Sequence, residues 1–350
     1  MPRFKHDALL EFGRRLLSSG GVPESESRLL AELLLKADLS GYTGHGILRI
    51  PSYLSWLKNG ATTVKEKPKI VREGKTTAVI DANHYIGQVA ASQAMALAIA
   101  KAEEHGVGIV CLLRAGHVGR LADYMEQAAE RGMIGLGAVS VGAGNIPPYG
   151  AMEAVTGTNP MAFGIPGRNG RHIIFDFATS AMSMGELHKR VSQGEKIPEG
   201  VLLDGRGNST TDYQSFLGPP KGVVLPFGGY KGAGLNLVTE ILGGLLSGNG
   251  PGSDWWQRGG HAVNGVFLEA FRVEEFQPLE EFYQRVEELA AFIKSRKPAP
   301  GFQEILLPGE GARKKTEKGL REGIEISRRV WDQLTELAAE LGVPDLPQPL

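Results

Sequence analysis

The sequence predicts a mixed α/β protein with a helical unit and an α/β sheet layer. Apolar residues recur at helical spacing over 5–18 and 24–36, which predicts two amphipathic helices near the start of the chain. From about residue 69 onward, short apolar runs alternate with longer helical patterns. This alternation is typical of a sheet covered by helices.

The first sixty residues are expected to be helical. The second helix begins after Pro23, with acidic residues in its first turn, as is usual for a helix N-terminus. A third helical pattern runs over 47–60 and ends at Gly60. Pro51 must either start a new helix there or kink an existing one, because it cannot donate a backbone hydrogen bond.

The rest of the chain alternates between the two periodicities. Strands are predicted over 69–73, 76–82, 107–113, 133–141, 161–167 and 172–178, and helices over 87–106, 119–132 and 183–194. Beyond Tyr230 the patterns predict helices over 234–248, 279–297 and 327–342, and strands over 262–273 and 304–310.

The composition excludes several classes of function. With 38 basic and 39 acidic residues the formal net charge is −1, so there is no electrostatic signature of binding to nucleic acid or to an anionic membrane. No apolar run is long enough to span a membrane, and "MPRFKHDALL" lacks the apolar region of a signal peptide. A cytoplasmic protein is expected. Cys111 lies in an apolar run and should be a buried, inert thiol. No metal is expected, because no residue set has zinc-binding spacing.

The segment "GHGILR" places His45 and Arg49 among glycines and aliphatic residues. On a helix, positions i and i+4 share one face. A guanidinium holds a carboxylate through two parallel hydrogen bonds, and a neighbouring imidazole can transfer a proton near neutral pH. The pair therefore suits a small 2-oxo or 2-hydroxy acid. Spacing alone favours a simpler interpretation, in which an ordinary histidine sits near a helix end and the arginine reaches the surface.

Two further segments are candidates for function. His117 follows a buried strand, and functional groups often lie beyond the carboxyl ends of strands in α/β folds; an ordinary turn with a polar histidine is an equal alternative. Four glycines between 228 and 234, together with Lys231, precede a helix. Exposed N–H groups, a helix dipole and a lysine could bind a phosphate, although a glycine-rich helix start with a surface lysine would look the same.

A conventional dinucleotide-binding fingerprint is absent. Gly142 and Gly144 follow a predicted strand, but Pro147 and Pro148 stand where the helix and the third glycine belong. If the protein uses NAD, it must therefore bind it in another way than a Rossmann fold does.

Taken together, ordered segments along nearly the whole chain resemble the type 2 malate/L-lactate dehydrogenase family. This family includes ureidoglycolate, sulfolactate and diketogulonate oxidoreductases and a cyclic-imine reductase, and its fold is unrelated to that of the Rossmann lactate and malate dehydrogenases. The matching segments include "GHGILRIPSYL", "AGHVGRLADYMEQAAERGMIGLGAVS", "FDFATSAMSMG", "PFGGYKGAGLNLVTEILGGLLSG" and "LLPGE". The resemblance implies a mainly helical domain of 1–75 with 235–350, an α/β cofactor-binding domain of 76–234 with a mixed sheet, and a homodimer with its active site near the subunit boundary.

Carried over by position, the resemblance also implies functional residues. His45 would donate or accept a proton, Arg49 would hold the substrate carboxylate, and His117 would be a second active-site histidine. The cofactor, NAD or NADP with NAD slightly favoured, would contact Ile174, Phe175, Asp176, Phe177, Ala178, Thr179, Ser180, Lys231, Gly232, Pro308, Gly309 and Glu310. Asp176 is also a candidate for orienting a histidine.

The implied activity is NAD(P)-dependent hydride transfer between nicotinamide and a small 2-hydroxy or 2-oxo acid, malate- or lactate-like. Gly44 and Gly116 depart from the family pattern, which has a serine and an asparagine there, so two side-chain hydrogen-bonding groups are missing near the presumed substrate. Two alternatives remain. One is reduction of a cyclic imine 2-carboxylate or of another 2-oxo acid, and the other is a nicotinamide-binding relative without catalysis.

Overall fold

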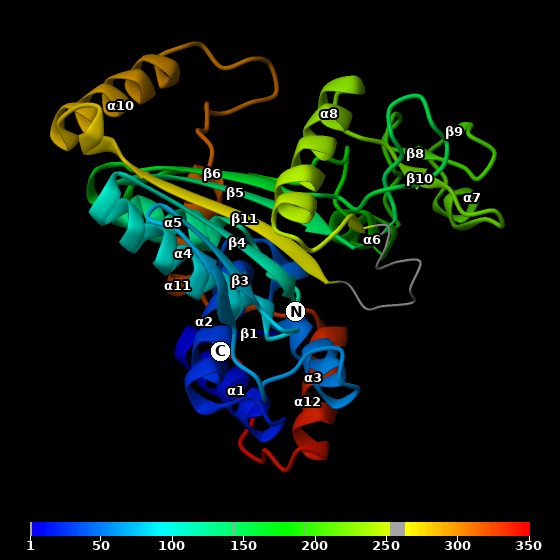
Figure 1. Cartoon of the computed structure of the whole chain (residues 1–350). Helices are drawn as coiled ribbons and strands as arrows, with labels where there is room; N and C mark the ends of the chain where they lie inside the picture. Colours follow the sequence, from blue (N-terminus) through cyan, green and yellow to red (C-terminus); the bar gives the residue numbers. More distant parts are fainter. Residues whose placement is uncertain (1, 143, 193, 253–262) are drawn as a thin grey trace.

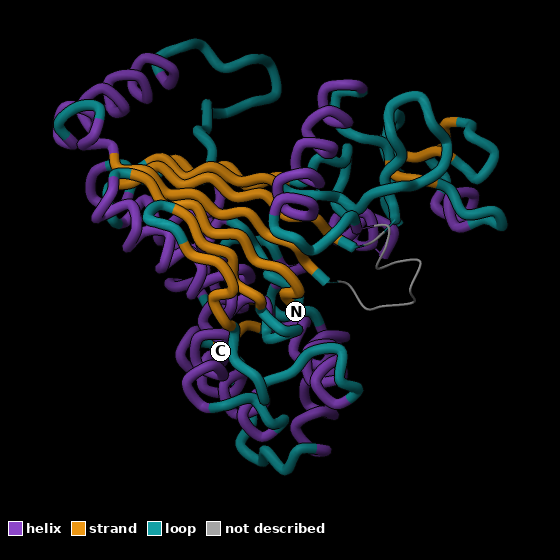
Figure 2. Tube along the Cα trace, viewed as in Figure 1, coloured by secondary structure: helices purple, strands orange, loops and turns teal. Residues whose placement is uncertain are grey.

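The computed structural model describes residues 2–142, 144–192, 194–252 and 263–350. A central sheet stands above a helical unit that contains both ends of the chain, and a smaller lobe lies beside the sheet (Figure 1). Figure 2 shows the same arrangement by secondary structure, with the strands of the main sheet running side by side through the middle of the molecule. The predicted α/β fold with a helical unit is confirmed.

The helical unit packs around a continuous apolar core. It contains α1 (His6–Ser19), α2 (Glu24–Leu39), α3 (Ile50–Lys58) and α12 (Arg328–Glu340). Strand β1 (Arg3–Phe4) pairs with β12 (Ile324–Glu325), which brings the start of the chain against its C-terminal part. Pro51 lies in the first turn of α3 and therefore starts a new helix.

The main sheet is mixed. Its seven strands are ordered β2-β3-β4-β11-β5-β6-β7, and only β3 and β4 run parallel. The strands are β2 (Lys69–Glu73), β3 (Thr77–Asp81), β4 (Val107–Ala115), β5 (Met133–Val141), β6 (Met161–Ile165), β7 (Ile173–Phe177) and β11 (Asn264–Arg272). A sheet with so many antiparallel pairs is not a Rossmann sheet, as expected.

Helices cover both faces of the sheet. Helices α4 (Gly87–His105) and α5 (Ala122–Glu130) pack on one face through a core rich in alanine. Helix α8 (Tyr230–Thr239) and the π-helical segment η4 (Glu240–Leu246) lie over the end of β5 and β11 on the other face (Figure 1). Helix α10 (Leu279–Lys294) extends away from the sheet. Cys111 on β4 is buried, as predicted.

The smaller lobe was not predicted in detail. It contains α6 (Met184–Ser192), α7 (Tyr213–Leu217), and a three-stranded sheet of β8 (Leu202–Leu203), β9 (Ser209–Thr210) and β10 (Val223–Val224). These strands are too short to give a periodic signal in the sequence. Residues 193 and 262, at the ends of two predicted elements, lie outside the described residues.

Two features of the C-terminal part differ from expectation. Strand β11 lies in 235–350 yet occupies the centre of the sheet, so this range contributes to the sheet as well as to the helical unit. The predicted strand over 304–310 is wrong. That segment has no regular secondary structure up to Gly309, and α11 (Glu310–Glu322) begins at its end. Among the described residues, no helix is long and apolar enough to cross a membrane.

Candidate active site

His45 and Arg49 do not lie on one continuous helix, and the helix predicted over 47–60 begins only at Ile50. The segment forms two short 3₁₀ turns, η1 (Thr43–His45) and η2 (Ile47–Arg49), separated by Gly46 in an extended conformation. The carboxylate of Asp38, near the end of α2, accepts a hydrogen bond of 2.8 Å from the backbone N–H of Ile47. A Cβ on residue 46 would lie 1.9 Å from Asp38 Oδ1. The chain therefore turns around this carboxylate, and the i, i+4 argument for this pair does not hold.

The two turns nevertheless bring His45 against His117. The imidazole rings are stacked, with 5.4 Å between their centroids and 3° between their planes. His117 lies in the loop after β4, and both neighbours in this loop are fixed through their backbone. Gly116 N–H donates to the carbonyl oxygen of Tyr85 (3.0 Å), and Val118 N–H donates to the side chain of Asn264 (3.1 Å).

Helix α3 contributes a residue that the sequence analysis missed. The hydroxyl of Tyr53 forms a 2.7 Å hydrogen bond with Nδ1 of His117. Trp56, three residues further along α3, presents its ring at 6.5 Å from the ring of His117. Tyr53 and Trp56 therefore fix how the His117 ring lies. The one signal in the sequence was their i, i+3 spacing on the helix directly after Arg49.

Burial keeps both imidazoles neutral at pH 7. It lowers the pKa of His45 to about 4, and the positive charges of Arg49 and Arg120 add to the effect. Burial also lowers the pKa of His117 well below its ordinary value, helped by His45 and Arg49. Nδ1 of His45 is buried, and no described residue forms a hydrogen bond with it. The pair is therefore in the state that can accept a proton.

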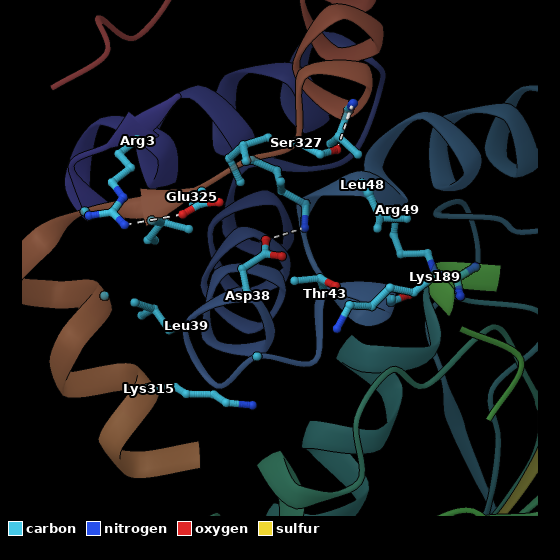
Figure 3. A pocket seen from close by; sticks show the side chains of 18 of the residues that line it. Arg3, Asp38, Leu39, Thr43, Leu48, Arg49, Lys189, Lys315, Glu325 and Ser327 are labelled. Carbon is cyan, nitrogen blue, oxygen red and sulfur yellow. Dashed lines mark hydrogen bonds and ion pairs between the residues drawn. The ribbon is translucent and has the colours of Figure 1, made fainter. Parts of the chain in front are cut away.

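Arg49 lies at the edge of a large cavity. Its Nε donates a 2.7 Å hydrogen bond to the carbonyl oxygen of Gly44, and no described acidic side chain forms an ion pair with its guanidinium. The cavity, of about 930 Å³, lies between the helical unit, α6 and α11. Figure 3 shows Arg49 and Lys189 beside each other in the lining of this cavity. The remaining donors of Arg49 are therefore available to an anion.

A buried charged cluster lies behind the two histidines. The guanidinium of Arg120, which is 3 % exposed, forms a 2.5 Å ion pair with Asp123 and lies 5.5 Å from the centre of the Tyr42 ring. Asp176 accepts a 2.9 Å hydrogen bond from Ala122 N–H at the start of α5, rather than one from a histidine. Burial raises the pKa of Asp176 to about 6. Arg120 was not identified from the sequence, because nothing in the sequence marks it as buried.

The predicted cofactor segments lie close together around β7. Gly309 has a φ of +90°, and a Cβ there would lie 3.2 Å from the backbone N of Ile174, so 308–310 lies against 174. Beyond β7, Phe227 N–H donates to the carbonyl oxygen of Thr179 (3.1 Å), and Gly232 N–H donates to the carbonyl oxygen of Phe227 (3.0 Å). The start of α8 is thereby joined to 174–180.

The side chains of these segments differ in exposure. Lys231 is exposed at the start of α8. Phe175 is 46 % exposed and stacks on Phe177 with 4.4 Å between ring centroids. Glu310 is already engaged, because its carboxylate accepts 2.8 Å hydrogen bonds from Lys294 and one of 3.0 Å from Leu307 N–H. The described residues contain no group of three His, Cys, Asp or Glu side chains that could hold a metal ion.

Two neutral, stacked imidazoles near an arginine that has no acidic partner among the described residues are groups that could exchange a proton with a small carboxylic acid and bind it. The comparison with known proteins identifies the class further. The chain belongs to the malate/L-lactate dehydrogenase family, whose sequence profile matches residues 4–335. The resemblance recognised in the sequence is confirmed, and the protein is an oxidoreductase.

Similar proteins cover almost the whole chain. The malate dehydrogenase of Pyrococcus abyssi is 35 % identical over 98 % of this chain and 96 % of its own length. The L-sulfolactate dehydrogenase of Methanocaldococcus jannaschii is 38 % identical over 94 % of both chains, and its solved structure superposes with a TM-score of 0.89 over 97 % of this chain and 98 % of that one, at 36 % identity. The Δ1-piperideine-2-carboxylate reductase structure from Pseudomonas syringae has a TM-score of 0.84 and 30 % identity, over 97 % of this chain and 100 % of that one.

Proposed function

We propose that this protein is an NAD(P)-dependent dehydrogenase that interconverts a small 2-hydroxy acid and the matching 2-oxo acid. One observation carries the proposal, namely the stacking of two neutral histidines next to an arginine whose guanidinium has no acidic partner in the described part of the chain. Malate, sulfolactate and lactate dehydrogenases among the similar proteins support an acid of this size.

The chain's own residues have distinct parts in this reaction. Arg49 holds the substrate carboxylate and so fixes the position of C2, and such positioning can lower the barrier by several kcal/mol. We assign the uptake of the alcohol's hydroxyl proton to His45, whose buried Nδ1 forms no hydrogen bond with a described residue. If the Tyr53 hydroxyl donates to Nδ1 of His117, then Nε2 of His117 carries the proton and donates to the substrate oxygen. In the reverse direction, His45 returns its proton to the oxygen.

The nicotinamide cofactor, when bound, supplies the hydride acceptor or donor. The residues that would hold it are 174–180, Lys231 with Gly232, and 308–310. Their mutual contacts around β7 support this assignment, as do the exposed ring of Phe175 and the exposed ammonium of Lys231, which suits a phosphate. NAD is slightly favoured over NADP.

A homodimer completes the proposal. Helix α8 and η4 expose apolar side chains and bury polar ones, which is the reverse of an ordinary surface helix. The exposed apolar residues are Tyr230, Leu237, Val238, Ile241, Leu245 and Leu246. A patch of this kind marks an interaction site, and a second copy of the chain is the occupant that we propose.

A cyclic imine 2-carboxylate is the second candidate substrate. The structural similarity to the Pseudomonas syringae reductase favours it, and the same arginine would hold its carboxylate. The absence of a side chain at Gly44 leaves room beside the site for a larger acid.

Turnover assays test the proposal. Purified protein is offered NADH or NADPH with pyruvate, oxaloacetate, sulfopyruvate or a cyclic imine 2-carboxylate, and oxidation of the cofactor is followed by its absorbance. Turnover of a 2-oxo acid is expected with at least one cofactor. Turnover of the imine alone would select the second candidate. Cofactor binding without any turnover would indicate a non-catalytic relative, and failure to bind either cofactor would overturn the proposal.

A further inference from the structure

Helix α8 and η4 bury a row of polar side chains against the end of the main sheet. Asn236 and Glu240 lie four residues apart and therefore on one face of the helix, and both are buried, as is Asn159 on the facing loop. Neither histidine nor Arg49 is part of this group. Burying a polar group destabilises the fold unless the group is hydrogen-bonded, so the partners of these side chains indicate their role.

Glu240 joins three separate segments. Its carboxylate accepts hydrogen bonds from the side-chain amide of Asn159 (2.6 Å), from the hydroxyl of Ser140 at the end of β5 (3.0 Å) and from the backbone N–H of Gly252 (2.5 Å). Both carboxylate oxygens are therefore satisfied. Within the described ranges, no Lys, Arg or His side chain forms an ion pair with Glu240. The described donors to this carboxylate are thus all neutral groups.

Asn236 continues the group toward the proposed cofactor segment. Its amide nitrogen donates to the carbonyl oxygen of Gly157 and to the hydroxyl of Thr179, both at 2.9 Å. The hydroxyl of Thr179 in turn donates to the carbonyl oxygens of Thr158 (2.9 Å) and Asn159 (3.1 Å). The loop 156–159 and Thr179 are therefore tied to each other and to α8.

The helix widens where this group lies. The α-helical pattern of α8 changes to a π-helical one at Glu240 and stays so to Leu246. Segments of π-helix inside α-helices are rare and occur frequently at functional sites. The π-helical segment begins at Glu240, the residue that contacts Ser140 on the sheet. Glu240 lies about one helical turn beyond Asn236 and about two turns beyond Gly232.

We infer that Glu240 and Asn236 are positioning residues that hold the loop 156–159 and the Thr179–Ser180 turn in the conformation that binds the nicotinamide cofactor. This inference rests on the proposed function. In it, the polar face of α8 contributes to cofactor affinity and takes no part in the chemical steps. Networks that are fully hydrogen-bonded make a site rigid. Removing one acceptor leaves a buried donor unpaired and releases the segment attached to it.

Glu240→Gln tests this in the full-length protein. The substitution keeps the size of the side chain but replaces one of its two acceptor oxygens with an NH₂ group. That NH₂ group then faces another hydrogen-bond donor instead of accepting from it. We expect the Kd for NADH or NADPH, measured by fluorescence titration without substrate, to rise about tenfold, while kcat at saturating cofactor changes less than about twofold. Amide hydrogen exchange of 156–159 and 179–180 should become faster in the protein without cofactor.

Glu26→Gln is the matched control. Glu26 is 7 % exposed, against 6 % for Glu240, and it accepts a 2.7 Å hydrogen bond from the buried Tyr85 hydroxyl within the helical unit. We expect it to lower Tm as Glu240→Gln does, without changing the Kd for the cofactor. Ser140→Ala, which removes a single donor to Glu240, is the milder second variant and should change the Kd in the same direction by a smaller factor.

The outcomes separate this inference from the proposed function. If the wild-type protein binds neither cofactor, both are overturned. If the wild-type protein binds a cofactor and Glu240→Gln and Ser140→Ala bind it equally well, or if Glu26→Gln weakens it as much as Glu240→Gln does, the residues are merely structural and this inference alone is overturned.

Discussion

The ring of His45 lies parallel to the ring of His117, with 5.4 Å between their centroids. Two imidazoles this close repel each other when both are charged, and burial makes even one charge costly. Because both pKa values are lowered, the pair is neutral at pH 7 and can take up one proton at a time. This is the protonation state required to oxidise an alcohol.

The stability of the protein should depend on pH through His45. The pKa of this ring is 6.5 in the unfolded chain and about 4 in the folded one, so between these values the unfolded state binds more protons and stability falls as pH falls. When the pH falls from about 7 to about 5, the free energy of unfolding of the wild-type protein should drop by about 2 kcal/mol more than that of His45→Asn. Urea denaturation of both proteins at the two pH values measures the difference, and parallel losses would contradict a buried neutral His45.

Arg49 should determine affinity for the acid. Arg49→Met removes the charged fork and should lower kcat/KM for any 2-oxo acid by about 100-fold, mostly through KM. Arg49→Lys keeps the charge but not the two parallel donors, and should recover only part of the loss. Arg328→Met, which removes an exposed arginine paired with Asp332, is the control and should leave the kinetics unchanged. Unaltered kinetics in Arg49→Met would remove this residue from the site.

Tyr53 should act through the orientation of His117. Tyr53→Phe removes the 2.7 Å hydrogen bond to Nδ1 while keeping the ring in the helical core. We expect kcat to fall about tenfold with little change in the KM for either substrate. Tyr283→Phe on α10 is the matched control. A Tyr53→Phe protein with normal kcat would show that the His117 ring is held by packing against Trp56 alone.

Much of the fold could be predicted because its elements have local signals. The helices of 6–19, 24–39 and 87–105 follow from helical periodicity, and the buried strands follow from short apolar runs. The central place of β11 could not be predicted, because it depends on pairing with β4 and β5 over long sequence distances. Helix α11 was missed because "EGARKKTEKGLRE" contains almost no apolar residues to show a periodicity.

The site was predictable in its parts but not in its arrangement. His45 and Arg49 could be selected because basic residues among glycines are unusual. The condition that both lie on one helix is not met, because the carboxylate of Asp38 accepts a hydrogen bond from Ile47 N–H and the chain turns at Gly46. The stacking of His45 on His117 and the bond from Tyr53 arise from tertiary packing, so no spacing in the sequence indicates them.

The apolar face of α8 and η4 should be a contact between two copies of the chain. Leu246, 57 % exposed on η4, is a suitable probe. Leu246→Glu places a charge in the proposed interface and should convert a dimer into a monomer in sedimentation experiments. Phe276→Glu, at an apolar position beyond β11 that is 76 % exposed, should leave the dimer intact. A monomeric wild-type protein, or dissociation by Phe276→Glu alone, would contradict this interface.

Two glycines on either side of His45 should respond to substitution in opposite ways. A Cβ at Gly44 would lie 3.7 Å from Cα of Gly185, which is an ordinary contact, whereas one at Gly46 would overlap the Asp38 carboxylate. Gly44→Ser should therefore leave Tm unchanged and, by adding a hydroxyl beside the proposed substrate, lower the KM for a small 2-oxo acid by about 2- to 10-fold. Gly46→Ala should cost about 2 kcal/mol, because it displaces Asp38 from Ile47 N–H. Thermal melts and steady-state kinetics of both variants measure these effects. A destabilised Gly44→Ser would mean that the space beside His45 is closed, and a larger acid would then have no room there.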